Sequence, residues 1–344
     1  MSKTRHAWIF ILTLFFSAGL FSQIPPGYYD DAMGLSGDEL KAALHNIIKD
    51  HAEYSYTQIK ELLEETDEDP LNTDNVILLY TGRSQNKNTF GGGPDDWNRE
   101  HVWAKSHGDF GNDPPCGTDI HHIRPADASV NSDRGNKDFD SGGQQHPEAT
   151  GCYYTEYTWE PRDEVKGDVA RMIFYMAVRY EGTSGELDLE VVDWVNTAPA
   201  PEHGKFSTLL EWNSFDPPND FEINRNNVIY SYQNNRNPFV DFPEFVNMIW
   251  DPASIADEIS TENDIKIYPL PAKDYITIEL NNPFAISYTI KLFNVFGNNV
   301  YCDNYSFSNN NPLKIDLREL TDGLYFIYII SEKYIAEDKV LIKR

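Results

Sequence analysis

Basic residues are scarce in this chain, and their scarcity argues against one class of function. Lys and Arg number 28 against 55 Asp and Glu, so the formal net charge is −27 over 344 residues. Charge of this sign argues against a protein that holds nucleic acid on a broad basic surface. It leaves open an enzyme that meets a phosphate group through a bound metal. Hydrophobic residues make up 40% of the chain, so we expect a packed core rather than intrinsic disorder.

Long hydrophobic runs are also missing after residue 21. The run from Ala7 to Phe21 follows Lys3 and Arg5 and precedes Ser22, which is the pattern of a signal peptide over residues 1–22. The run is short for a transmembrane helix, and the alternative is a membrane anchor. No later segment stays apolar for long enough to span a bilayer. The sequence therefore predicts a soluble mature protein with no stable membrane span.

Cysteine is rare as well, and one common zinc motif is absent. The cysteines are Cys116, Cys152 and Cys302. In an oxidising compartment Cys116 and Cys152 could form a disulfide, and the alternative is that all three are free thiols. No His-Glu-x-x-His pattern occurs, so a zinc hydrolase would have to be assembled from scattered histidines.

Hydrophobic periodicity divides the chain into two units. Residues 38–51 and 169–180 carry apolar side chains at helical spacing and predict two helices. After about residue 260, apolar and polar residues alternate in short runs, which indicates an all-β sandwich. We therefore predict a catalytic domain over residues 23–260 and a second domain over residues 261–344. The acidic excess lies in the catalytic domain, because charges nearly balance after residue 260.

Two polar segments of the first domain carry groups suited to chemistry. One is residues 98–103, NREHVW, and the other is residues 119–139, DIHHIRPADASVNSDRGNKDF. The second predicts a strand over residues 119–125 and a short helix over residues 128–134, which a glycine closes. The predicted layout is strand, loop, strand, helix, with Asn131 one turn into the helix.

Glu100, His101 and Asn131 supply the parts of a one-metal phosphodiesterase. A carboxylate and an amide oxygen are hard ligands that suit Mg²⁺ when water and phosphate fill the other positions. A neutral imidazole beside that metal can take a proton from an attacking water near neutral pH. Because adjacent strand residues point to opposite sides, Glu100 and His101 can share a site only at an irregular or terminal strand position.

Residues 98–108 (NREHVWAKSHG) and 119–139 resemble the two signature blocks of the endonuclease I family. Further stretches fit the family in the same order, so the resemblance covers roughly residues 28–250: these are residues 28–48, 160–182 and 221–239. The resemblance implies an α+β fold with a ββα-metal (His-Me finger-like) active site. It also implies a secreted enzyme that cleaves DNA, and often RNA, without sequence preference and leaves 5′-phosphates.

The resemblance assigns roles position by position. His101 matches the general base, and Glu100 and Asn131 match the metal ligands. The expected metal is Mg²⁺, with Mn²⁺ or Ca²⁺ as substitutes. Arg134 matches a retained arginine, to which we assign phosphate contact or support of the site. The chain departs from the family pattern at Ala104, where proline is usual, and at Phe242, where histidine is frequent.

Five further residues are predicted to contact phosphate or to support the site: Arg99, Lys105, Asp119, His122 and Arg124. Simpler interpretations stay open for several of them. An exposed lysine usually serves solubility, Asp119 could cap a strand, and Arg124 could pair with Asp119 or Asp127. His121 and His122 would alternate along a strand, one facing or bracing the site and the other structural. His107 and His146 are predicted on surface loops.

The end of the chain resembles a type IX secretion sorting domain. The matching stretches are residues 267–274 (IYPLPAKD), 292–297 (LFNVFG), 320–325 (LTDGLY) and the basic end Lys343-Arg344. Leu270 stands where the usual motif has asparagine. The resemblance implies the type IX secretion machinery as a partner, removal of the tail, and a secreted or cell-surface location. The alternative is a sandwich that binds carbohydrate or a surface.

The favoured prediction is therefore a secreted, Mg²⁺-dependent, monomeric nuclease whose substrate is DNA, with RNA as an open further substrate. Two rivals remain. A zinc hydrolase built on the histidines predicts tightly held, stoichiometric zinc. An adhesin displayed through the tail predicts surface binding with no metal-dependent turnover.

Overall fold

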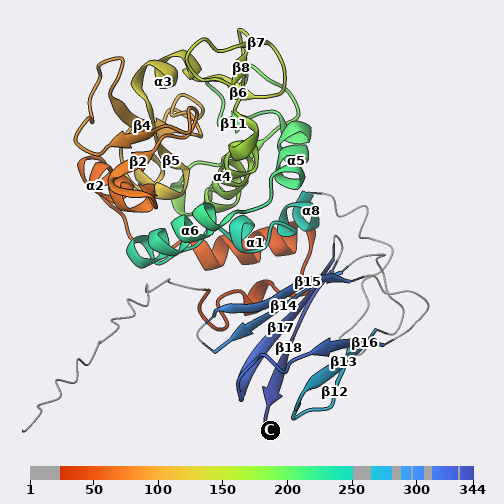
Figure 1. The fold of residues 1–344 in the computed structure, drawn as a ribbon. Coiled ribbons are helices and arrows are strands. Elements are labelled where there is room, and N and C mark those ends of the chain that lie inside the picture. Colours follow the sequence, from red (N-terminus) through yellow and green to blue (C-terminus); the bar gives the residue numbers. More distant parts are fainter. Residues whose placement is uncertain (1–23, 251–264, 281–287, 296, 306–311, 332–333) are drawn as a thin grey trace, which may run out of the picture.

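The computed structural model of the protein describes residues 24–250, 265–280, 288–295, 297–305, 312–331 and 334–344. A unit of mixed helices and strands covers residues 24–250, and an all-β unit follows from residue 265 onward (Figure 1). The predicted signal peptide and the predicted boundary near residue 260 lie outside the described residues.

The first unit is built on one buried helix, α4 (Lys166–Arg179), whose residues from Gly167 to Arg179 are all buried. Its polar side chains are paired: Arg171 contacts Glu222 with a separation of 2.8 Å between Nε and Oε1. The other helices are α1 (Gly37–Ile48), α2 (Tyr56–Thr66), α3 (Ala128–Arg134), α5 (Phe206–Phe215), α6 (Asp220–Gln233), α7 (Pro238–Asp241) and α8 (Phe245–Trp250). The predicted helices at residues 38–51 and 169–180 are thus confirmed as α1 and α4.

Short strands and 3-10 turns complete the first unit. Its sheets are β1-β2-β3, β4-β5, β6-β9-β8-β7 and the parallel pair β10-β11. The strands are β1 (Glu68–Asp69), β2 (Asn72–Ile77), β3 (Ser84–Asn86), β4 (Trp97–His101), β5 (Ile123–Asp127), β6 (Asp138–Phe139), β7 (Gln144–Gln145), β8 (Tyr153–Tyr154), β9 (Thr158–Glu160), β10 (Glu190–Val191) and β11 (Glu202–His203). The 3-10 turns are η1 (Asp30–Ala32), η2 (Cys116–Thr118), η3 (Ile120–His122), η4 (Asp163–Val165) and η5 (Thr183–Gly185).

The segment that carries the predicted chemistry is a strand pair followed directly by a helix. β4 and β5 pair antiparallel, with Trp97 opposite Asp127 and His101 opposite Ile123. Helix α3 begins at the next residue, Ala128, and ends before Gly135, whose φ of 59° suits a residue without a Cβ atom. The predicted order of strand, loop, strand and helix is confirmed.

The prediction was wrong about how the second strand begins. Residues 120–122 form the 3-10 turn η3, and the strand starts only at Ile123. His121 and His122 therefore do not alternate along a strand. The side chain of Asp119 accepts the backbone N–H of His121 at 3.0 Å, which stabilises the turn at its first residue.

The second unit packs two antiparallel sheets around one core. The strand orders are β12-β13-β16 and β15-β14-β17-β18, and both sheets contribute to a shared apolar cluster. The strands are β12 (Ile265–Tyr268), β13 (Tyr275–Leu280), β14 (Tyr288–Asn294), β15 (Asn299–Tyr305), β16 (Leu313–Asp316), β17 (Gly323–Ser331) and β18 (Tyr334–Ile342). The prediction of an all-β unit is confirmed. The sequence did not predict strand β15, because this edge strand alternates little between apolar and polar residues.

Candidate active site

The end of β4 and the middle of α3 bring Glu100, His101 and Asn131 to one place. Asn131 donates from Nδ2 to the side-chain oxygen of Asn98 at 2.6 Å and to the carbonyl oxygen of Arg99 at 3.2 Å, so it contacts β4 beside Glu100. His101 is the last residue of β4. The terminal position is the one in which neighbouring strand residues can face a common site.

The ring of His101 is held in one tautomer. Its Nε2 lies 3.1 Å from the carbonyl oxygen of Gly117, and a carbonyl can only accept, so Nε2 carries the proton. Within the described part of the chain Nδ1 has no hydrogen-bond partner, and it is not among the atoms sealed from solvent. Burial, and then the neighbouring His122, lower the pKa of His101 well below its usual value. The geometry therefore presents a neutral imidazole with a bare Nδ1.

Gly117 is required for that contact. A Cβ atom at residue 117 would lie 2.8 Å from backbone atoms of Gly111 and Asn112, a separation that real side chains do not show. The glycine lets η2 pack closely on the preceding loop, and this packing presents the carbonyl oxygen to His101. The sequence prediction did not include Gly117, because nothing near it in the chain reveals which backbone it must approach.

The carboxylate of Glu100 is buried, and one of its oxygens is already paired. Oε1 accepts the Tyr80 hydroxyl at 2.6 Å and lies 3.4 Å from Nη1 of Arg134. No hydrogen bond reaches Oε2 from any residue in the described ranges. Burial raises the pKa of Glu100 above its usual value, although Arg134 and the hydrogen bond from Tyr80 act in the opposite direction. One orphaned oxygen on a buried, oriented carboxylate fits a metal ligand.

The amide of Asn131 is oriented in the same sense. Its Nδ2 must be the atom facing β4, because the Arg99 carbonyl can only accept a hydrogen bond. Oδ1 then points away, and no residue of the described chain donates to it. A hard carboxylate oxygen and a hard amide oxygen, both without protein partners, are the donor set that a small divalent cation accepts.

Arg134 is fully buried and joins the strand to the helix. Its guanidinium donates to the carbonyl oxygens of His101 at 3.1 Å and Val102 at 2.6 Å, and it lies 4.7 Å from the Phe139 ring. Of the two roles predicted for Arg134, these contacts favour support of the site over contact with phosphate.

Two cations lie beside the Tyr56 ring, which stacks on His101. The Arg99 guanidinium carbon is 3.6 Å from the Tyr56 ring centroid, and Arg99 also donates to the Tyr56 carbonyl oxygen. Tyr56 in turn stacks on His101 with ring centroids 5.8 Å apart. Lys105 is half-buried and donates a hydrogen bond to Asn112 at 2.8 Å. It lies close enough to Glu100 for the two charges to attract each other. Tyr56 lies far from the signature blocks in sequence, and its tyrosine alone gave no signal of this position.

Two further predicted residues, His122 and Asp119, are buried. His122 is fully buried, lies 5.4 Å from His101 between ring centroids, and contacts the Cys116 carbonyl oxygen at 2.9 Å. Burial lowers the pKa of His122 to about 4. Asp119 accepts hydrogen bonds from Tyr175 at 2.8 Å and Tyr180 at 3.0 Å. Burial alone would raise the pKa of Asp119, but the histidines around it leave that pKa below its usual value.

Arg124 pairs with neither of the two expected carboxylates. It is fully buried, contacts Asp67 with its Nε and lies 3.2 Å from Asp168 with its Nη1. The alternative that Arg124 pairs with Asp119 or Asp127 was wrong. The partners are carboxylates from α4 and from the end of α2, which the linear sequence does not place nearby.

A second histidine group lies behind the site and is fully buried. It consists of His107, Asp138 and His203, whose ligand atoms all lie within 4.8 Å of one another, and by residue type it could hold a metal. In the structure these ligand atoms already form hydrogen bonds with other groups of the protein. His107 contacts the carbonyl oxygens of Glu202 at 2.7 Å and Asn136 at 2.8 Å. The prediction of surface positions for His107 and His146 was wrong, since both are buried.

The hydrogen bonds of His203 and Asp138 complete this buried cluster. His203 lies 3.0 Å from the Gly204 carbonyl oxygen through Nδ1 and 3.3 Å from Nη2 of Arg134 through Nε2. Asp138 accepts from the backbone N–H groups of Thr197 at 3.0 Å and Gly204 at 2.8 Å. The cluster thus touches the Arg134 that supports the predicted site.

Cysteine pairing and membrane-spanning helices can be checked in the described residues. Cys116, Cys152 and Cys302 are free thiols, so the alternative of free cysteines holds in the structure. Among the described residues, no helix combines the length and the apolar character needed to cross a bilayer.

Comparison with known proteins identifies both units. The endonuclease I family profile matches residues 36–244, and the secretion system C-terminal sorting domain profile matches residues 266–343. The extracellular ribonuclease of Bacillus subtilis (strain 168) is 60% identical over 224 residues, 65% of this chain and 78% of that protein. The extracellular ribonuclease of Bacillus amyloliquefaciens is 59% identical over 224 residues, with the same coverage.

Solved structures also align with part of this chain. The sulfur carrier protein SoxY from Chlorobium limicola f thiosulfatophilum is 19% identical, with a TM-score of 0.18 over 27% of this chain and 96% of that chain. A score this low supports no conclusion about fold or function. The sorting domain, together with relatives named extracellular, identifies this chain as a secreted protein.

Proposed function

Because the chain belongs to the endonuclease I family, we propose that it is a metal-dependent nuclease that hydrolyses DNA and RNA at the site formed by Glu100, His101 and Asn131. The observation that carries the proposal is the set of three unfilled acceptor atoms. His101 Nδ1, Glu100 Oε2 and Asn131 Oδ1 all lack protein partners in the described ranges, and β4 with α3 brings their residues together. This unit is the proposed ββα-metal site.

Glu100 and Asn131 would hold the metal, for which we propose Mg²⁺, with Mn²⁺ or Ca²⁺ as substitutes. Their oxygens are hard ligands, and two protein ligands leave positions for water and phosphate. A divalent cation held there supplies positive charge that stabilises negative charge on the phosphate and on the leaving oxygen. Tyr80 and Arg134 hold the Glu100 carboxylate from its other oxygen, so the ligand is oriented before metal binds.

His101 acts as the general base in this proposal. The Gly117 carbonyl keeps the proton on Nε2, so Nδ1 can accept a proton from the attacking water. Burial keeps the ring neutral near neutral pH, which is the state that a base requires. Tyr56 stacks on the ring and limits its rotation.

Arg99 and Lys105 are the cations proposed to meet the phosphate backbone. Tyr56 and Phe90 hold the Arg99 guanidinium, whose centre lies 5.1 Å from the Phe90 ring, so little side-chain freedom is lost when phosphate binds. Phosphate contacts carry no base information, so sequence preference should be slight. The strongly negative remainder of the domain would repel nucleic acid and favour release of product.

The sugar of the substrate is the least constrained part of the proposal. The relatives in Bacillus are named ribonucleases, which supports RNA as a substrate, and the site chemistry acts on a phosphodiester whatever the sugar. We also propose that the enzyme is a monomer, that residues 23–260 form the catalytic domain, and that residues 261–344 form the domain read by the type IX secretion machinery.

The test is digestion of plasmid DNA and a long RNA by the purified mature chain, with Mg²⁺ or with EDTA. We expect cleavage of both substrates with Mg²⁺ and none with EDTA. His101→Ala should lower kcat by at least about a thousandfold, because a general base and its positioning are both lost. His45→Gln is the matched control, since His45 lies on α1 and bonds to Val178 and Thr183 instead of the site. Full activity of His101→Ala would refute the assigned base.

A further inference from the structure

The sorting domain carries a second apolar face, in addition to the face that forms its own core. Strand β17 has Tyr325, Ile327 and Ile329 in the core between the two sheets. The alternate residues point the other way, and yet Tyr328 is only 9% exposed and Ile330 only 1%. A strand that is buried on both faces needs cover on both faces.

The cover for the outer face comes from the nuclease domain. Phe293, Tyr328 and Ile330 belong to the same apolar cluster as Tyr29, Phe242 and Phe245. The rings of Phe242 and Tyr328 lie 5.5 Å apart, and Nζ of Lys291 lies 5.6 Å from the Phe242 ring. Phe242 itself is 1% exposed. An aromatic pair and a cation near a ring are contacts with defined geometry, beyond simple burial.

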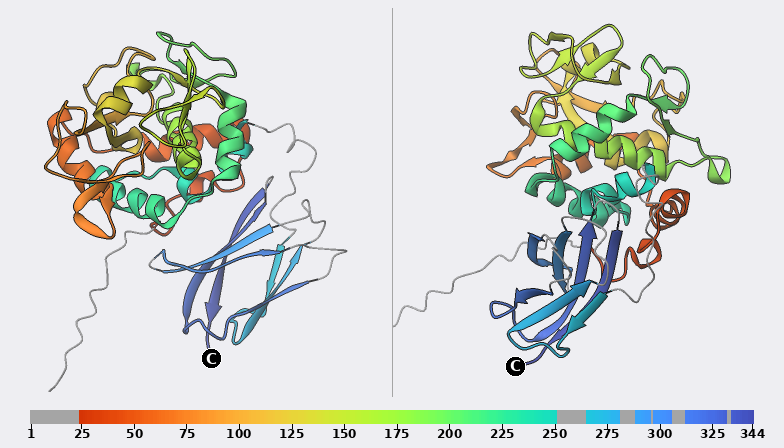
Figure 2. Two further views of the ribbon diagram at one scale, coloured as in Figure 1. Left: turned by 45° about the horizontal axis from the view of Figure 1, so that its top comes forward. Right: turned by 90° about the vertical axis from the view of Figure 1, so that its right-hand side faces the viewer.

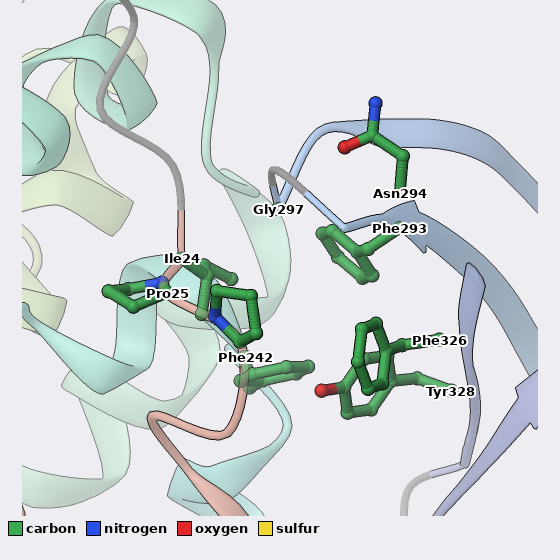
Figure 3. A pocket seen from close by; sticks show the side chains of 9 residues that line it. Ile24, Pro25, Phe242, Phe293, Asn294, Gly297, Phe326 and Tyr328 are labelled. Atoms are coloured by element: carbon green, nitrogen blue, oxygen red, sulfur yellow. The ribbon is translucent and has the colours of Figure 1, made fainter. Parts of the chain in front are cut away.

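The two surfaces meet along the end of the nuclease domain opposite the site. In Figures 1 and 2 the all-β unit lies beside α1 and α8, whereas α3 and β4 lie at the far end. Figure 3 shows Phe242 and Ile24 from the nuclease side directed toward Phe293, Phe326 and Tyr328. The cavity left between them measures about 20 Å³, room for about one water molecule, so it is a packing gap and not a ligand pocket.

We infer that the sorting domain docks on the nuclease domain of its own chain through the outer face of β14 and β17. The docking face consists of Phe293, Phe326, Tyr328 and Ile330, with Lys291 at its edge, and it meets Ile24, Tyr29, Phe242 and Phe245. Two consequences follow. While the domains are docked, this face is hidden from the secretion machinery, which must read other surfaces of the tail. Removal of the tail uncovers Phe242 and its apolar neighbours on the nuclease domain.

The variant that tests the inference is Tyr328→Glu in the full mature chain. Tyr328 lies outside the core of the sorting domain, and Lys291 stands directly opposite it in the β14–β17 ladder. A glutamate there can pair with Lys291 and keep the sheet folded while it removes the apolar contact. Leu324→Glu is the matched control, because Leu324 is on the same face of β17 but is 38% exposed.

The measurement is rotational tumbling of each domain by NMR relaxation, with small-angle scattering for overall size. In the wild type and in Leu324→Glu the two domains should share one correlation time. In Tyr328→Glu the sorting domain should tumble at least twofold faster than in the wild type, with a larger radius of gyration. Phe242→His, made on the opposite surface, should loosen the domains in the same direction.

Three results would overturn the inference: separate tumbling in the wild type, a Tyr328→Glu chain that tumbles as the wild type does, or equal loosening by Leu324→Glu. Nuclease activity of the same samples should stay within twofold of wild type, because the docking face is remote from Glu100 and His101. The docking experiment is therefore independent of the proposed function.

Discussion

Two groups of histidine and carboxylate side chains contact Arg134 in this fold, and they differ in whether their hydrogen-bonding atoms already have protein partners. In the proposed site, His101 Nδ1 and Glu100 Oε2 have no partner among the described residues. In the buried cluster, the atoms of His107, Asp138 and His203 are hydrogen-bonded to backbone carbonyls, backbone N–H groups or Arg134. Residue types alone would make the buried cluster the better metal site. The acceptor atoms that lack protein partners instead favour the proposed site as the metal site.

The two groups are connected through Arg134. Its guanidinium bonds to the His101 carbonyl on one side and meets the ring of His203 on the other. The buried cluster therefore contacts Arg134, which in turn lies against the carboxylate of Glu100. Burial of a charged guanidinium is costly, and the cluster supplies Nη2 of Arg134 with one hydrogen-bond partner, His203, whereas Nε has none in the described part of the chain.

Among the variants that compare the two groups, the largest expected effect comes from removing the carboxylate of the proposed site. Glu100→Gln keeps the shape but removes the charge that would bind the metal. Loss of a partner that merely orients a metal ligand typically costs 10–100-fold, so loss of the ligand should lower kcat/KM by at least about a hundredfold. Tyr80→Phe, which removes only the orienting hydroxyl, should cost about tenfold. If Glu100→Gln and the wild type were equally active at low Mg²⁺, Glu100 would not be a metal ligand, and the comparison would no longer favour the proposed site.

The second-largest expected effect comes from removing the two ring nitrogens of His203 from the buried cluster. His203→Phe keeps a ring of similar shape but removes one hydrogen-bond partner each from Nη2 of Arg134 and from the Gly204 carbonyl, which keep their bonds to Val102 and Phe139. Stability should fall by about 1–3 kcal/mol, measured by urea unfolding, with a smaller fall in kcat. Metal analysis of the dialysed wild type should find no tightly held zinc. Stoichiometric zinc that disappears in His203→Phe would make the cluster a metal site.

A pH effect on stability should follow from a third, buried histidine. Burial lowers the pKa of His121 to about 3, below its ordinary value of 6.5. The unfolded chain then binds the proton first as pH falls below 6.5, so acid favours unfolding. Between pH 6.5 and 5 this residue should cost about 1.5 kcal/mol of stability. His121→Gln should flatten the fall in unfolding free energy over that range, and an unchanged slope would show that the ring is protonated when folded.

The smallest expected effect concerns Lys105. Lys105→Ala should raise KM for DNA by about two- to tenfold and leave kcat nearly unchanged, because a half-buried cation that contacts only phosphate acts on encounter and binding. The dependence of KM on salt should weaken at the same time. Lys60→Ala is the control, since Lys60 pairs with Glu64 on α2. A large fall in kcat for Lys105→Ala would place the lysine in the chemistry.

Local sequence patterns determined the strand and helix that frame the site and the outline of the tail. Glu100, His101 and Asn131 lie in two compact segments, and β4, β5 and α3 formed in the predicted order. Alternation of apolar residues predicted the core-facing strands after residue 260, since each such strand repeats every second residue. These features depend on neighbours within about ten positions, and a linear pattern records such neighbours directly.

Only the tertiary structure decided the partners of these groups. Tyr80 reaches Glu100 across 20 positions, His203 reaches Arg134 across 69, and Tyr328 reaches Phe242 between domains. Arg124 found Asp67 and Asp168 in place of the nearby carboxylates. Chain packing brings such residues together, and their types repeat throughout the sequence, so no local signal distinguishes a partner from a bystander. Burial, which sets the protonation of His101 and His121, was decided in the same way.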